Sequence, residues 1–117
     1  MEKYDALITI INNNEKSKYN AEVHEDIERQ SLFYIEKDKT TTTYNYKDNI
    51  LKRDNDKINL EFTFNLNELT KNSITIKELN NTMEVDIITK EITHTDKILK
   101  IVYEMNDSLF TYIIEKE

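Results

Sequence analysis

The sequence contains no cysteine, no glycine and no proline. Without cysteine the chain forms no disulfide, carries no thiolate nucleophile and offers no Cys-ligated zinc site, which suits a reducing compartment. Without glycine it lacks the phosphate-cradling loop, the dinucleotide-binding fingerprint and the nucleophile elbow in their usual sequence forms. We therefore expect a protein that is not an enzyme, with no catalytic residue and no cofactor.

Long apolar runs are also missing. No stretch approaches the roughly 20 apolar residues of a membrane-spanning helix. An acid stands at Glu2, and no apolar run of signal-peptide length follows it. These features predict a cytoplasmic protein that has no membrane partner.

The sequence has no excess of positive charge. It holds 16 Lys and Arg against 23 Asp and Glu, a formal net charge of −7. Nucleic-acid binding depends on basic side chains that neutralise phosphates. We therefore expect no nucleic-acid partner and attribute the acidity to solubility.

No metal site is indicated. His24 and His94 lie far apart in the sequence, and neither has a second histidine at a metal-ligand spacing. Acids near His24, among them Glu22 and Asp26, could form a metal or acid-base cluster, but their alternation favours a solvated strand face. The segment Asp54-Asn55-Asp56 lacks the glycine and final glutamate of a calcium loop, so it predicts a turn.

The pattern that is present is alternation of apolar and polar residues. A chain of 117 residues has the size of one domain, so we expect residues 1–117 to share one core. The run from Ile58 to Leu66 alternates throughout, which is typical of a half-buried strand. A helix is expected only as a turn or two over 66–72. The segment 19–27 is compatible with helix, but its alternation and its β-rich surroundings favour a strand. The predicted strands cover 4–11, 19–27, 32–35, 41–46, 58–66, 73–76, 83–87, 99–105 and 110–114.

These short strands and their spacing predict the fold class. About nine strands with turns roughly every 8–12 residues are typical of a sandwich or barrel. We expect an all-β protein, a single antiparallel barrel of about eight to ten strands with at most one short helix.

Asparagine and aspartate take the place of glycine in the turns. Asn tolerates a left-handed backbone better than most residues do. Asn80-Asn81 and Asn106-Asp107 are predicted to form two-residue hairpin turns, and Lys37-Asp38-Lys39 is predicted to join two paired strands.

Aromatic residues are the one feature that could line a binding site. The chain has seven Tyr and four Phe, and a barrel of about eight strands has room for a small ligand. Two hypotheses stay open: a binding module for a small, partly apolar ligand, and a filled barrel that acts through its outer surface as a structural or regulatory interaction module. An interior cavity of roughly several hundred cubic ångströms would favour the first. The candidate lining residues are Tyr34, Tyr44, Tyr46, Phe62, Phe64, Tyr103 and Tyr112.

The order of several segments resembles a known family. Leu32-Phe33-Tyr34-Ile35, the strand over 40–46, the run 80–89 and the run 97–105 follow one another as in the YwiB-like proteins, a bacterial family of uncharacterised function. The resemblance covers nearly the whole chain. It implies a calycin-type, lipocalin-like β-barrel and, by analogy, a barrel mouth able to take a small apolar molecule. It implies no catalytic residue.

Overall fold

The computed structural model describes residues 1–117 and shows a closed antiparallel barrel of ten strands without a helix. The chain therefore has no helix that could cross a membrane. Each strand pairs with the next strand in the sequence, and the barrel closes because the first strand, β1, also pairs with the last strand, β10. The strands are β1 Glu2–Asn12, β2 Glu15–Asp26, β3 Ser31–Ile35, β4 Thr41–Asn45, β5 Ile50–Asp54, β6 Ile58–Thr63, β7 Leu69–Ile76, β8 Asn81–His94, β9 Ile98–Met105 and β10 Ser108–Lys116.

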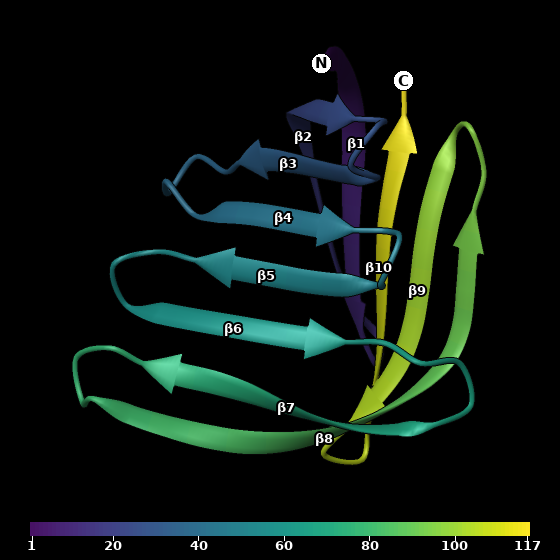
Figure 1. Ribbon diagram of the computed structural model, residues 1–117. Helices are drawn as coiled ribbons and strands as arrows, with labels where there is room; N and C mark the ends of the chain where they lie inside the picture. The colour runs from purple at the N-terminus through teal and green to yellow at the C-terminus, as the bar shows by residue number, and fades with distance from the viewer.

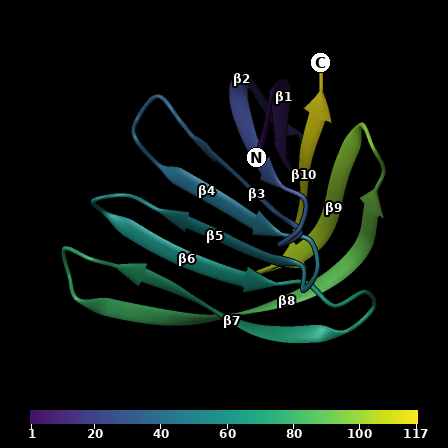
Figure 2. The ribbon, with the colours of Figure 1, turned by 45° about the horizontal axis from the view of Figure 1, so that its top comes forward.

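The barrel is built from two layers whose strands cross steeply. In Figure 1, β1, β2, β9 and β10 stand upright, whereas β3 to β7 run across them, and Figure 2 shows the same crossing after a tilt. The long strand β8 belongs to both layers. Its first part pairs with β7 and its second part with β9, and a bulge between Thr89 and Glu91 lies in the second part. A bulge bends and twists a strand, so it helps β8 turn the corner.

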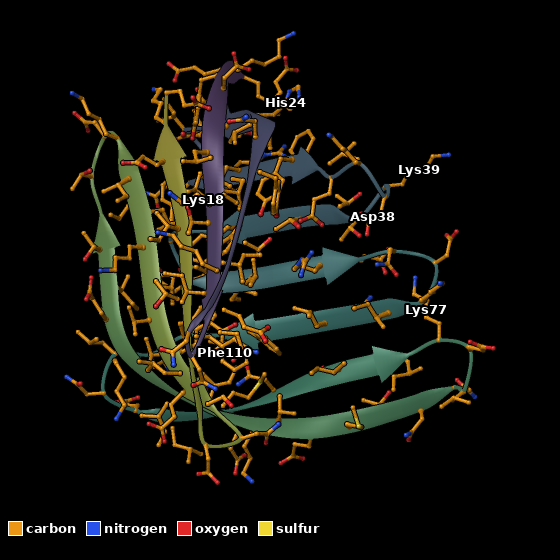
Figure 3. The ribbon with its side chains drawn as sticks, turned by 180° about the vertical axis from the view of Figure 1, so that it is seen from behind. Lys18, His24, Asp38, Lys39, Lys77 and Phe110 are labelled. Carbon is orange, nitrogen blue, oxygen red and sulfur yellow. The ribbon has the colours of Figure 1, made fainter.

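The second corner is formed by β2. Its last residues, His24 to Asp26, pair with Ser31 to Phe33 of β3, while the rest of the strand pairs only with β1. On the outer side of this corner, the imidazole of His24 stacks on the ring of Phe33 with centroids 4.8 Å apart. Figure 3 shows His24 near one end of β2 and Phe110 toward the opposite end of the barrel.

The core follows the predicted alternation. Phe62 and Phe64 are 3% and 1% exposed, whereas Glu61, which precedes Phe62 in β6, faces solvent. Seventeen buried apolar residues from nine strands or their ends form one contiguous cluster inside the barrel. Burial of apolar side chains on one face of these nine strands is what holds the two layers together.

Two predictions for the segment 58–72 are wrong, and one strand is missing from the prediction. The run from Ile58 ends as a strand at Thr63, and Leu66 lies outside the strand and is 50% exposed. The turn or two of helix expected over 66–72 is absent, because Leu66 forms an isolated parallel bridge with Thr89 and β7 begins at Leu69. The strand β5 was not predicted at all, since only Leu51 gives it an apolar buried position.

Asparagine does replace glycine at the turns. Eight residues other than glycine have a positive φ angle, and five of them are Asn. Asn106 and Asp107 have φ angles of 53° and 63° and join directly paired residues, which is the two-residue hairpin predicted. The turn before β8 differs from the prediction: it spans Lys77 to Asn80, the left-handed residue is Asn80 with φ 48°, and Asn81 already belongs to the strand.

Candidate functional site

The candidate site is a cavity of about 590 Å³ at one mouth of the barrel. It lies where the chain termini, the end of β2 and the turn between β8 and β9 come together, at the top of Figure 1. The strand ends supply its side chains: Tyr4 from β1, Glu25 from β2, His94 from β8 and Lys116 from β10. Tyr46, which follows β4, completes the wall. Strands far apart in the sequence thus converge on one opening.

Glu25 is the charged centre of this cavity. Its alternation with Val23, which is fully buried, places it on the inward face of β2. The hydroxyl of Tyr4 donates to Glu25 Oε1 at 3.0 Å, and the hydroxyl of Tyr46 donates to Oε2 at 2.9 Å. Each carboxylate oxygen thus accepts one neutral donor, and Glu25 takes part in none of the eight ion pairs of the structure.

The two tyrosines remain protonated donors at neutral pH. Burial and the hydrogen bond to Glu25 raise the pKa of Tyr46 to about 12. Burial, together with the negative charge of Glu25, raises the pKa of Tyr4 still further. A carboxylate beside a phenol disfavours the phenolate, since two negative charges would then be adjacent.

Aromatic faces and a cation surround the carboxylate. The imidazole of His94 packs on the ring of Tyr46 with centroids 4.5 Å apart. Lys116 holds its Nζ 4.4 Å from the centre of the Tyr4 ring, within the range of a cation–π contact. Below them the buried side chains of Leu32 and Leu99 line an apolar floor. The cavity is therefore amphipathic, with its polar groups at the rim and aliphatic carbon underneath.

No group of three or more His, Cys, Asp or Glu is placed to hold a metal ion. The two histidines occupy separate places: His24 stacks on Phe33 and lies 3.3 Å from Glu22 on the outer face of β2, whereas His94 stands at the cavity. The acids near His24 accordingly form no metal cluster.

Of the seven aromatic residues predicted to line a ligand site, Tyr46 lines this cavity. The other six lie in the packed interior of the barrel. Phe62, Phe64 and Tyr103 pack together, with ring centroids 5.0 to 6.4 Å apart. The hydroxyl of Tyr44 donates to Asn49 Oδ1 at 2.9 Å.

The remaining two, Tyr34 and Tyr112, belong to a buried polar chain. Their hydroxyls are 2.6 Å apart, and the hydroxyl of Tyr19 lies 3.4 Å from that of Tyr34. Tyr19 in turn donates to Glu36, whose carboxylate binds Arg53 at 2.7 Å. The hydroxyls in this chain have partners, so these tyrosines fill the interior without leaving buried donors unpaired.

The sequence prediction missed Tyr4, Glu25, His94 and Lys116 as site residues. A signal for Glu25 is present in the sequence, because it falls on the same face of the predicted strand as Tyr19, Ala21 and Val23. A carboxylate on an otherwise apolar strand face is unusual, so its position indicates a candidate functional residue. Nothing in the sequence shows that His94 and Lys116 reach the same opening, because that depends on barrel closure.

Comparison with known proteins supports the fold. No protein-family model matches the chain, and a search of curated proteins finds no match. Among solved structures, the chain is similar to the crystal structure of the ywiB protein from Bacillus subtilis, with 11% sequence identity and a TM-score of 0.63 over 98% of this chain and 89% of that chain. At this identity the likeness shows the fold alone: the protein is a small β-barrel with the architecture of YwiB.

Proposed function

We propose that this barrel binds a small, partly apolar ligand in the cavity at its mouth, as a binding protein without catalytic activity. The observation that carries the proposal is the amphipathic lining of that cavity. Its volume of about 590 Å³ lies within the range of small-molecule sites, and it combines aliphatic residues with a few convergent polar groups. A half-buried carboxylate, two phenols and an imidazole converge on this one opening.

The alternative is a filled barrel that acts through its outer surface. It is favoured by the interior, where seventeen buried apolar residues and the tyrosine chain occupy the space between the layers. Under this alternative the mouth cavity holds only water.

The setting of the protein belongs to the same proposal. We place it in the cytoplasm without nucleic-acid or membrane partners, because it has no cysteine and a net charge of −7. The shared architecture with YwiB supports grouping it with YwiB-like barrels of the calycin type.

A thermal-shift screen with fatty acids, alkylamines, tetrapyrroles and small aromatics tests the binding role. A compound at a hundred times its dissociation constant stabilises the fold by about 2.7 kcal/mol, which is readily visible in a domain of this size. Native mass spectrometry of the protein purified from its own host identifies any bound molecule directly.

Two matched variants locate the site. Ile27 lines the cavity and is 56% exposed, whereas Ile35 is 61% exposed and lies outside it. Ile27→Trp should fill the opening and abolish the shift, and Ile35→Trp should leave it unchanged. A shift that survives Ile27→Trp would place the ligand elsewhere, and a screen without any shift or adduct would favour the filled barrel.

A further inference from the structure

Two partly buried carboxylates of the barrel have different surroundings. Glu36, 11% exposed, is paired with the guanidinium of Arg53 at 2.7 Å. Glu25 has only the hydroxyls of Tyr4 and Tyr46. A carboxylate withdrawn from water is normally compensated by a cation, because phenol donors stabilise the charge without neutralising it. Glu25 thus carries an uncompensated negative charge beside a cavity.

The geometry leaves room for a cation at Glu25. Each of its oxygens accepts one tyrosine hydroxyl, and an ionised carboxylate offers about four acceptor positions in all. The remaining positions are free for donors from the cavity. The tyrosine rings flank the carboxylate, and an aromatic face also attracts cations.

The protein itself shows that an ammonium group fits this wall. Lys116 places its Nζ 4.4 Å from the centre of the Tyr4 ring but forms no ion pair with Glu25. One face of the Tyr4 ring, beside Glu25, is therefore already in contact with an alkylammonium group, that of Lys116. A second ammonium brought by a ligand would meet both the carboxylate and the rings.

The charge of the lining favours a cation over an anion. Three carboxylates and two lysines line the cavity, which gives −3 + 2 = −1 with His94 neutral. A divalent metal is disfavoured, because no group of three or more ligating side chains is placed to hold one. The aliphatic floor of Leu32 and Leu99 suits an alkyl or aryl body attached to the cationic head.

We propose that the ligand of the mouth cavity is an organic ammonium ion whose head binds Glu25 between Tyr4 and Tyr46 and whose apolar body lies on the aliphatic floor. This inference rests on the proposed binding function and names the chemical class of its ligand.

Three probes of equal chain length test the head group: octylammonium, octanol and octanoate, each titrated into the full-length protein by isothermal titration calorimetry. Octylammonium should bind at least roughly tenfold more tightly than octanol, since a hydrogen bond to a charged group is worth about 1.5–3 kcal/mol. Octanoate should bind most weakly. Glu25→Gln should remove the preference for octylammonium, whereas Glu22→Gln, the same change on the exposed outer face of β2, should keep it.

Lys116→Gln gives an independent readout. Removing the internal ammonium from the Tyr4 ring should tighten octylammonium binding by about two- to fivefold, the value of an exposed cation–π contact. In a site built for an anion, the same substitution would weaken binding of octanoate instead.

Equal binding of octanol and octylammonium, or tighter binding of octanoate, would overturn the cationic head group and leave the binding role intact. The same conclusion would follow if none of the three probes bound while the broader screen yielded only ligands without an ammonium group. If neither the probes nor the broader screen gave binding, the proposed function would fail with it.

Discussion

At the scale of single residues, the interior is distinguished by hydroxyls held in hydrogen bonds. Tyr34 is fully buried and Tyr112 is 4% exposed, and their hydroxyls are 2.6 Å apart. A buried phenol costs free energy unless it is hydrogen-bonded, so each of these tyrosines depends on the other. Such a pair also fixes the relative positions of β3 and β10, which are not neighbours in the barrel.

Removing one hydroxyl from this pair should destabilise the protein. Tyr34→Phe leaves the hydroxyl of Tyr112 buried without its partner, and we expect a loss of about 1–3 kcal/mol in the free energy of unfolding. Tyr103→Phe is the control, because the hydroxyl of Tyr103 makes no hydrogen bond in the structure, and its effect should stay within about 0.5 kcal/mol. Urea unfolding measures both. Equal effects of the two substitutions would show that the tyrosine pair adds no stability.

The choice of which face of β6 is buried leads to a second prediction at this scale. Phe62 is 3% exposed and contacts the rings of Phe64 and Tyr103, whereas the neighbouring Glu61 faces solvent. Phe62→Ala should cost about 3–5 kcal/mol, because it removes a large buried side chain and leaves a cavity. Glu61→Ala should change stability by no more than about 0.5 kcal/mol. Small and equal losses in urea unfolding would mean that the opposite face of β6 is buried.

At the scale of elements, turns without glycine depend on asparagine. Asn80 adopts φ 48° in the turn before β8, whereas Asn81 is the first residue of that strand. Asn relieves part of the cost of the left-handed backbone through its short polar side chain. Glycine has no such cost, but it loses more conformational entropy than other residues when held in a strand.

These neighbouring asparagines should respond oppositely to glycine. Asn80→Gly should be neutral or stabilising by up to about 1 kcal/mol, and Asn81→Gly should be destabilising by about 0.5–1 kcal/mol. Thermal unfolding of the two variants beside the parent measures the difference. If Asn81→Gly were the better tolerated of the two, the left-handed position would be one residue later than the structure places it.

Strand positions could be predicted from the sequence wherever one face is apolar. Alternation of the kind seen around Phe62 reports burial directly, and the barrel class follows from the number and spacing of such runs. The strand β5 could not be predicted, because one of its inward residues is Arg53. The charge of Arg53 is compensated by Glu36, seventeen positions earlier in the chain. A long-range ion pair of this kind has no local signature.

The candidate site was largely hidden for the same reason. Tyr46 could be chosen as the last aromatic residue of the predicted strand 41–46, but Tyr4, Glu25 and His94 meet only when β1, β2 and β8 end at one mouth. The turn before β8 was predicted as Asn80-Asn81 but spans Lys77 to Asn80, because two adjacent asparagines do not show which of them adopts the left-handed backbone. Only the pairing of β7 with β8 decides which of them bends the chain.

At the scale of the whole molecule, barrel closure gives tyrosines from most of the strands a common response to pH. All seven tyrosines have a pKa above the ordinary value of 10.0, and burial is the leading cause in every case. For Tyr46 and Tyr103 burial raises the pKa to about 12. The neutral phenol is therefore the form that the folded barrel requires.

This requirement predicts unfolding in alkali. Above pH 10 the unfolded chain releases phenolic protons that the folded protein still holds, so the free energy of unfolding falls as pH rises. The contribution of the tyrosines is complete below the unfolded pKa and is lost as pH passes through the folded values, about 12 for Tyr46 and Tyr103. Because ionising one buried phenol loosens the packing of the next, tyrosinate absorbance and the loss of β circular dichroism should rise together in one cooperative step.

The reference for that titration is the protein in concentrated urea, where all seven phenols should ionise near pH 10. Lysines lose their charge in the same alkaline range, but tyrosinate absorbance does not respond to them, so the two processes can be separated. In the native protein, absorbance at pH 10 should be a small fraction of that in urea. Full tyrosinate absorbance near pH 10 with the β signal retained would show that the phenols are open to solvent, and the packed interior of the barrel would be wrong.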